Sequence, residues 1–258
     1  AGLSSAYRCE RRPAMKSILV IMKRECGAYF YTPIAWIFIA LQMAIMSFFF
    51  FQFSPFFIIE SADMRVWFGL TPFMMMVFAP AVTMRLWSEE IRTGSTEVLL
   101  SLPVKSRDLV IGKWLAAVIV LVASVAASLG IPAALSWLAA SPVDWGPIMG
   151  GYIGTVLAGM MFLALGCWVS ALSSNQVVSL LVGVTVGIVL VLALSPDFAS
   201  YLSASQPGLA RVVESLGVQS HFQAIERGVL AVSDVVYFLS GSVLFLTLCV
   251  FQVELKKQ

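Results

Sequence analysis

Charged side chains are scarce in this sequence. Only 12% of the 258 residues are Asp, Glu, Lys or Arg, whereas a soluble domain carries about 25%. The hydrophobic share is 60% and the mean hydropathy is +0.93. Because polar side chains are too few to cover a surface in water, the composition predicts a membrane protein and excludes a large soluble catalytic domain.

Other absences exclude further classes of protein. The net charge is only +2, so the chain lacks the positive excess on which nucleic-acid binding depends and we expect no nucleic-acid partner. The four cysteines, at positions 9, 26, 167 and 249, show no CxxC spacing. Neither a disulfide framework nor a zinc site is therefore indicated, and we predict no metal-binding residue.

The chain also lacks the sequence motif of an ATP-hydrolysing site. It contains no G-x-x-x-x-G-K-[ST] phosphate loop, because Gly112-Lys113 is followed by Trp114 and has no upstream glycine at the required spacing. We therefore predict no catalytic residue, no cofactor-binding residue and no enzyme activity in this chain.

Six apolar runs have about the length that crosses a bilayer. They cover residues 33–53, 67–86, 114–139, 147–172, 177–195 and 235–251. Apart from Arg85, near the end of the second run, they contain no Asp, Glu, Lys, Arg or His. Because ionisable groups in membrane spans mark proton and ion pathways, a proton-coupled carrier or an ion pump loses support.

Basic residues gather on one predicted side of the membrane. Twelve of the 16 Lys and Arg residues lie in three segments, before the first run, between the second and third runs, and after the last, and Arg85 stands at the end of the second run beside the middle segment. Cytoplasmic loops are enriched in Lys and Arg. The pattern predicts an even number of spans with both termini in the cytoplasm.

An amphipathic segment precedes the first run. From Met15 to Phe30, apolar residues recur at helical spacing while Lys16, Lys23 and Arg24 fall elsewhere on the wheel. Such a helix lies in the membrane interface. The pattern alone leaves two interpretations open, an elbow helix that carries cytoplasmic contacts into the first span and a basic anchor beside anionic lipid.

The loop between the second and third runs, residues 88–112, carries the clearest signals. Gly94 is placed to end the helix that continues from the second run. Ser95 then begins a short apolar helix that Pro103 ends. An apolar helix ringed by charge outside the membrane favours a protein partner, and the alternative is an amphipathic loop lying on lipid.

The order of residues in this loop resembles the membrane subunit of type-2 ABC transporters, the exporter class of permeases. The matching positions are Met84-Arg-x-x-x-Glu-Glu-x-Arg-x-Gly-x-Thr-Glu-x-Leu-Leu-x-x-Pro103 and then Gly112-Lys113. Two further motifs are similar to the gliding-motility-associated branch: Lys23-Arg-Glu25 before Tyr29-Phe-x-x-Pro33, and His221-Phe222 followed by Asp234-x-x-Tyr-Phe238. The likeness runs from about residue 15 to residue 251.

The resemblance implies an all-α membrane protein of a bacterial inner membrane. Its parts are a flexible extension at 1–14 and a six-span permease domain at 15–258, with an elbow helix at 15–32, a coupling loop at 88–112 and a helical external segment at 196–234. The implied partners are an ABC ATPase that holds ATP and Mg, a second permease copy or a paralogue, lipid, and in some systems an auxiliary membrane or periplasmic subunit. The positions implied for coupling are Glu89, Glu90, Arg92, Gly94, Thr96, Glu97, Leu99 and Pro103, with Lys23, Arg24 and Glu25 on the elbow.

The external segment holds the only histidine, His221, next to Phe222. A structural hydrogen bond or loop role competes here with a pH or metal role, and a lone imidazole without neighbouring ligands makes a weak metal site. Helices in this segment would cover the exit of the pathway.

Three functions follow as hypotheses. The first is an export permease driven by ATP hydrolysis in a partner chain. The second is a non-transporting membrane scaffold that transmits ATP-driven motion to a periplasmic or motility protein. The third, a channel or secondary carrier, would need no ATPase.

Overall fold

The computed structural model describes residues 14–53, 64–95, 104–138, 144–203, 206–228 and 231–256. Within these ranges the regular structure is helical throughout. The elements are α1 (Ala14–Phe30), α2 (Pro33–Phe53), α4 (Arg65–Gly69), α5 (Thr71–Thr83), α6 (Arg85–Thr93), α8 (Ser106–Ser128), α9 (Gly130–Leu138), α10 (Trp145–Leu172), α11 (Gln176–Ile188), the π-helical turn η1 (Val189–Ala193), α12 (Pro196–Ser203), α13 (Pro207–Leu216), α14 (Val218–Glu226) and α15 (Val232–Leu255).

Five stretches of the described residues are long and apolar enough to cross a membrane. They are Ala35–Phe53, Ser106–Leu138, Trp145–Leu172, Gln176–Ala193 and Val232–Leu255. These stretches coincide with five of the six predicted runs, so the chain is a multi-pass membrane protein.

The remaining predicted run, residues 67–86, folds as three consecutive short helices. The chain is divided at Leu70, between α4 and α5, and at Met84, between α5 and α6. Pro72 stands in the first turn of α5 and Pro80 inside it. Leu70 and Met84 keep right-handed helical dihedral angles, so the chain continues to wind as a helix through both points. The two prolines supply no backbone N–H and interrupt its hydrogen bonding.

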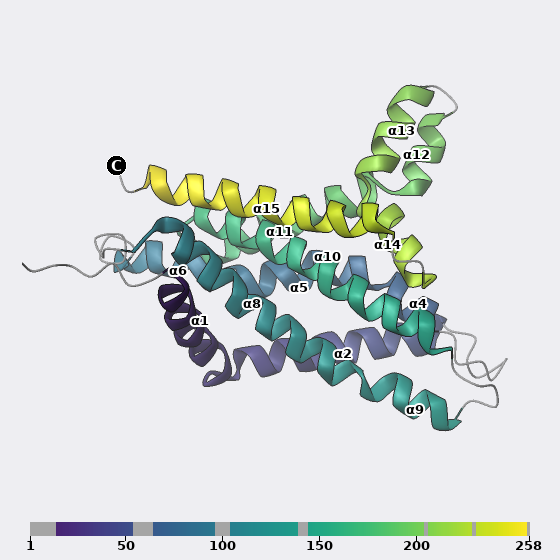
Figure 1. The fold of residues 1–258 in the computed structure, drawn as a ribbon, viewed down its shortest axis with the longest axis horizontal. Coiled ribbons are helices and arrows are strands. Elements are labelled where there is room, and N and C mark those ends of the chain that lie inside the picture. The colour runs from purple at the N-terminus through teal and green to yellow at the C-terminus, as the bar shows by residue number, and fades with distance from the viewer. Residues whose placement is uncertain are drawn as a thin grey trace, which may run out of the picture.

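Helix α10 is the centre of the bundle. It packs against α15, α5, α8 and α11, and Figure 1 shows it running between them. About 72% of the residues in its most apolar 18-residue stretch are buried, compared with 17% in the corresponding stretch of α2. The more exposed helices therefore present apolar faces outward, as helices surrounded by lipid do.

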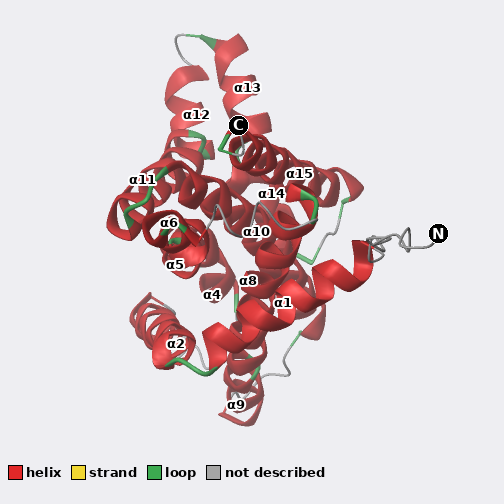
Figure 2. Cartoon of the chain, turned by 90° about the vertical axis from the view of Figure 1, so that its left-hand side faces the viewer, coloured by secondary structure: helices red, strands yellow, loops and turns green. Residues whose placement is uncertain are grey.

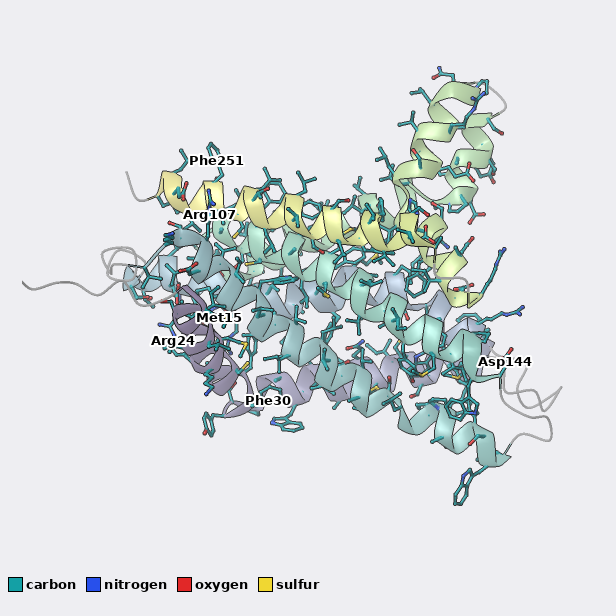
Figure 3. The ribbon with its side chains drawn as sticks, viewed as in Figure 1. Met15, Arg24, Phe30, Arg107, Asp144 and Phe251 are labelled. Atoms are coloured by element: carbon teal, nitrogen blue, oxygen red, sulfur yellow. The ribbon has the colours of Figure 1, made fainter. Side chains whose placement is uncertain are left out.

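The two ends of the bundle differ. Helices α1 and α6 lie at one end together with the C-terminal end of α15, and α4, α9 and α14 lie at the other (Figure 1). Viewed from the first end, α1 crosses the bundle (Figure 2). Arg24 and Arg107 are near this end and Asp144 is near the opposite one (Figure 3). Segments predicted to share one side of the membrane thus share one end of the fold.

Candidate functional site

Four charged side chains join α1, α6 and α8 at the end of the bundle that carries α1. The Lys113 ammonium lies 2.8 Å from Glu90 Oε1 and 3.4 Å from Glu25 Oε1. The Arg24 guanidinium lies 3.1 Å from the same Glu90 oxygen and 2.5 Å from Glu25 Oε1. Two cations and two carboxylates therefore alternate across three helices, and we call these four residues the charge cluster.

Lys113 is the buried centre of the charge cluster. Its side chain is 1% exposed, donates a hydrogen bond of 2.7 Å to the carbonyl of Leu86, and lies 4.9 Å from the ring centroid of Trp87. A desolvated ammonium is tolerated only where carboxylates and acceptors replace its water. Lys113 has both, so its position depends on the other members of the cluster.

Gly112 explains how α1 comes close enough to complete the cluster. A Cβ atom built on Gly112 would lie 2.8 Å from Ile21 Cγ2 and 3.2 Å from the carbonyl oxygen of Ile18. Any larger residue would push α1 away from α8. The Gly112-Lys113 pair thus combines a close helix contact with the cation beside it.

The Glu25 carboxylate is held in its charged form from within the cluster. Burial opposes ionisation of Glu25, but the charge of Lys113 and the hydrogen bond from Arg24 outweigh it, so the pKa of Glu25 is lowered. Glu90 uses one oxygen for both cations. Its other oxygen, Oε2, is buried and accepts no hydrogen bond from the described residues.

A second linkage ties α1 to the joint between α5 and α6. The buried Tyr29 hydroxyl donates to the carbonyl of Val82 at 2.7 Å. The guanidinium of Arg85 lies 5.2 Å from the Tyr29 ring centroid and donates to the carbonyl of Ala28 at 3.4 Å. The joint between α5 and α6 is therefore bonded to α1 by this pair as well as by the charge cluster.

Ser170 connects the same joint to α10. Its hydroxyl oxygen accepts from the backbone N–H groups of Trp87 (3.1 Å) and Ser88 (3.3 Å) and donates to the carbonyl of Met84 (2.9 Å). The Trp87 indole N–H also points to the sulfur of Cys167, at 3.4 Å. The start of α6 is thus bonded directly to the central helix.

Replacing Ser170 with alanine is expected to lower the unfolding free energy by about 1–3 kcal/mol, because buried backbone groups lose their partner. Thermal unfolding of the purified chain in detergent measures this. Ser136→Ala is the matched control, since the exposed Ser136 hydroxyl bonds only within α9 and its loss is expected to leave the melting temperature unchanged. Equal melting temperatures for both variants would contradict the role of Ser170.

Comparison with known protein families fits this architecture. The sequence model described as ABC-2 family transporter protein matches residues 40–253, most of the chain. The chain belongs to the ABC-2 transporter family. None of the curated proteins matches it. As an ABC-2 protein it is a permease subunit of an ABC transporter, a membrane transport component that is not itself an enzyme, and this family in general works with an ABC ATPase.

In this ABC-2 permease the predicted coupling positions are only partly within the described residues. Glu90 lies in the charge cluster, whereas Glu89 and Arg92 lie on α6 and face outward. Gly94 ends α6 with φ +71°, and its N–H bonds to the carbonyl of Ile91. The predicted helix end is therefore confirmed. The positions outside the described residues are Thr96, Glu97, Leu99 and Pro103.

The elbow triplet is divided between two environments. Arg24 and Glu25 enter the charge cluster, while Lys23 is exposed. The sequence alone allows Glu90 to pair with Lys23, with Arg24 or with a second copy, and the structure pairs it with Arg24 and Lys113. The sequence pattern did not identify Lys113 as the shared partner. The available signal was a lone lysine immediately before an apolar run.

The two positions singled out in the external segment have different surroundings. Phe222 is fully buried, and His221 forms a 2.7 Å contact with the carboxylate of Asp234. Among the described residues, no group of three or more His, Cys, Asp or Glu side chains could hold a metal ion. The structural hydrogen bond expected as one role of His221 is therefore present.

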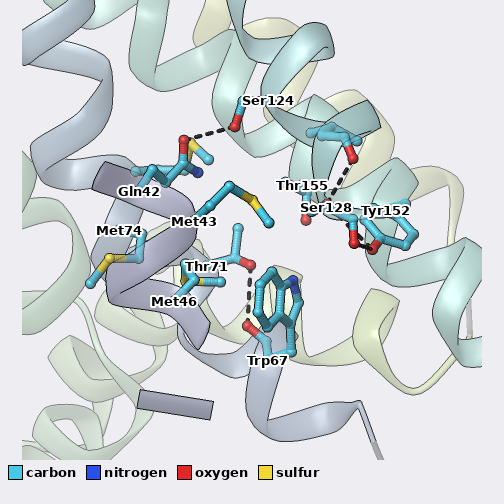
Figure 4. Close-up of a pocket in the computed structure, with 12 residues that line it drawn as sticks. Gln42, Met43, Met46, Trp67, Thr71, Met74, Ser124, Ser128, Tyr152 and Thr155 are labelled. Atoms are coloured by element: carbon cyan, nitrogen blue, oxygen red, sulfur yellow. Dashed lines mark hydrogen bonds between the residues drawn. The ribbon is translucent and has the colours of Figure 1, made fainter. Parts of the chain in front are cut away.

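An uncharged cleft lies between α2, α4, α5, α8 and α10 (Figure 4). It is lined by Gln42, Met43, Met46, Trp67, Thr71, Met74, Met75, Ser124, Val125, Ser128, Tyr152 and Thr155. The cleft has room for roughly one water molecule. The Ser124 hydroxyl donates to Gln42 Oε1 at 2.8 Å across it, so the cleft walls are joined by hydrogen bonds.

Proposed function

We propose that this ABC-2 permease forms the membrane-spanning part of an ATP-driven exporter. Its helices change arrangement when a separate ATPase acts on it from the cytoplasm. The observation that carries the proposal is the charge cluster around the buried Lys113, which joins α1 and α8 to α6, the helix that ends at Gly94. A force applied to that loop would reach the spans through these contacts. The predicted coupling helix in this loop is the natural point for an ATPase to act.

In this proposal α4, α5 and α6 together form a sixth crossing. With the five long apolar stretches, this crossing gives an even number of spans and places both termini on one side. The distribution of Lys and Arg supports the cytoplasm for that side, and the family resemblance supports a bacterial inner membrane. Helix α1 is then the elbow helix, and α12 to α14 belong to the external segment.

The proposed mechanism needs no bond chemistry in this chain. ATP and Mg bind to the partner ATPase, whose closure displaces the coupling helix formed by residues 95–102. Helix α6 follows because Gly94 joins it to that helix. The charge cluster then passes the displacement to α1 and α8, and Ser170 passes it to α10. Two copies, or a copy and a paralogue, would alternate between inward-open and outward-open arrangements.

The α12–α13 hairpin supports a second candidate function. It projects sideways from the bundle (Figure 1) and exposes apolar side chains, among them Tyr201 (81%), Leu209 (52%) and Val212 (51%). A non-transporting member of the gliding-motility-associated branch would use such a surface to pass motion to an auxiliary outer subunit. Cargo-stimulated ATP hydrolysis in reconstituted vesicles favours the exporter, and its absence favours this alternative.

Glu97→Lys provides the test of coupling. We expect the wild-type chain, purified from its own membranes, to bring an ABC ATPase with it and to support ATP hydrolysis. In the variant a cation replaces an anion on the predicted contact with the ATPase, so hydrolysis is expected to fall to background while membrane insertion is unchanged. Arg211→Glu, which reverses an exposed charge on α13 away from the predicted contact, is the control. Full hydrolysis and transport by Glu97→Lys would remove the assignment of this loop.

A further inference from the structure

His221, Asp234 and Tyr237, the polar residues of the C-terminal motif, form one contact unit between α14 and α15. The His221 Nδ1 atom lies 2.7 Å from Asp234 Oδ1, and Nε2 lies 3.1 Å from the carbonyl oxygen of Ser215. The Tyr237 ring stacks on the imidazole with centroids 4.1 Å apart and planes 20° apart. The motif therefore joins α13, α14 and α15 at a single point.

Both ring nitrogens of His221 face acceptors. A carboxylate oxygen and a backbone carbonyl oxygen can only accept hydrogen bonds, whereas a neutral imidazole has one donor and one acceptor. Only the doubly protonated ring can donate to both. We infer that His221 is an imidazolium while α14 is docked on α15, and that loss of its proton releases the external segment.

The helix ends around His221 favour this ion pair. Ser215 and Leu216 are the last residues of α13, where carbonyl groups have no partner within the helix and a positive charge is stabilised. His221 donates to the first carbonyl and the Tyr237 hydroxyl donates to the second at 2.6 Å. Asp234 lies in the first turn of α15, where a negative charge is stabilised.

Apart from His221, the Asp234 carboxylate has few hydrogen-bond partners among the described residues. It is 5% exposed, and its Oδ2 atom accepts no hydrogen bond from the described residues. Ser233 adds a 3.4 Å bond to Oδ1. The carboxylate therefore depends on His221 for its cationic partner, and a neutral ring would leave it nearly buried with one weak donor.

The remaining charges near α14 lie on few elements. Helix α14 packs against α4, α5, α10, α15 and η1. The described parts of α5, α10 and η1 contain no Asp, Glu, Lys, Arg or His. Arg65 stands on α4, Arg211 and Glu214 on α13, Glu226 on α14 itself, and Asp234 and Glu254 on α15.

The direction of the pH effect follows from the donor count. At low pH the ring carries both protons and holds α13 and α14 on α15. As pH rises and the ring loses one proton, one of its two hydrogen bonds is lost and docking weakens. That the released segment uncovers an exit path rests on the proposed function, whereas the docking itself does not.

Two measurements on one sample test the inference. The chain is labelled with ¹⁵N-histidine, carries a tag without histidine and is held in lipid nanodiscs. Because His221 is the only histidine, the ¹⁵N chemical shifts report the protonation of one ring. Spin labels at Gly208→Cys on α13 and Val243→Cys on α15, with Cys9 and Cys26 replaced by serine, report docking as a distance. Both are followed from about pH 5 to about pH 9, the range that contains histidine titration.

We expect ring deprotonation and the loss of the short distance to occur together, with the docked population falling by about tenfold, the factor that one hydrogen bond between charged groups supplies. His221→Gln should be released at every pH, and Ser233→Ala should keep the wild-type pH dependence. A neutral ring with the segment still docked, or a distance that does not respond to pH, would overturn the inference. The wild-type titration needs no substitution of His221, so a misfolded variant cannot hide either result, and neither measurement requires an ATPase.

Discussion

Lys113→Met is expected to lower the unfolding free energy by about 3–5 kcal/mol, because it leaves the carboxylates of Glu25 and Glu90 without their buried cation. Removing one partner of a buried charge pair costs more than the pair contributes, since the remaining charge cannot regain its water. The same change removes the ionic link of α8 to α1 and α6. Hydrolysis by the associated ATPase should therefore no longer respond to the permease.

The melting temperature of the purified chain and the ATPase rate of the complex measure the two effects. Lys105→Met is the matched control, because Lys105 is exposed at the N-terminus of the same helix, and it should change neither. Adding Glu90→Gln to Lys113→Met removes one of the two carboxylates that would then share Arg24 alone, and it should recover part of the lost stability. If Lys113→Met melts like the wild type and keeps full coupling, the charge cluster does not connect the helices as proposed.

Gly94→Val is expected to uncouple the permease while leaving its insertion intact. Gly94 has φ +71°, a left-handed conformation that costs an L-residue about 1–2 kcal/mol and a β-branched residue more. Valine would force the chain out of this conformation and redirect the segment that begins at residue 96. Permease-dependent ATP hydrolysis should then fall to background.

Two control variants separate conformation from size. Gly94→Asn should retain most of the activity, because asparagine tolerates the left-handed region, and a Cβ atom at position 94 meets nothing within 4 Å. Gly208→Val should behave as the wild type, because Gly208 has similar open space without a positive φ. Equal loss of hydrolysis in the Asn and Val variants at position 94 would show that the glycine matters for a reason other than its backbone angle.

The membrane-crossing stretches were predictable because the bilayer imposes them. An apolar run such as 33–53 has no stable alternative to a helix across lipid, and α2 has these bounds. The end of α6 at Gly94 was also predictable, since glycine is the residue that best adopts the left-handed cap. The sequence did not locate the interruptions at Leu70 and Met84. A proline indicates a kink, but the residue at which the helix is interrupted also depends on the helices packed around it.

The candidate site was only partly predictable. Glu90 and Arg24 were identified as partners among several, but Lys113 lies 88 residues from Glu25 and meets it only because α1 packs along α8. Spacing within one helix cannot show such a contact. Likewise, the sequence placed His221 and Asp234 in one motif, but the two acceptors facing the ring became visible only when α13, α14 and α15 were placed together.

Nucleotide hydrolysis by the purified chain tests the central claim most directly. Reconstituted alone in lipid nanodiscs, the chain should hydrolyse no ATP, and addition of the ABC ATPase that co-purifies with it should restore hydrolysis that Lys113→Met and Gly94→Val abolish. Hydrolysis by the chain alone would contradict the account, as would a complex whose rate ignores both substitutions.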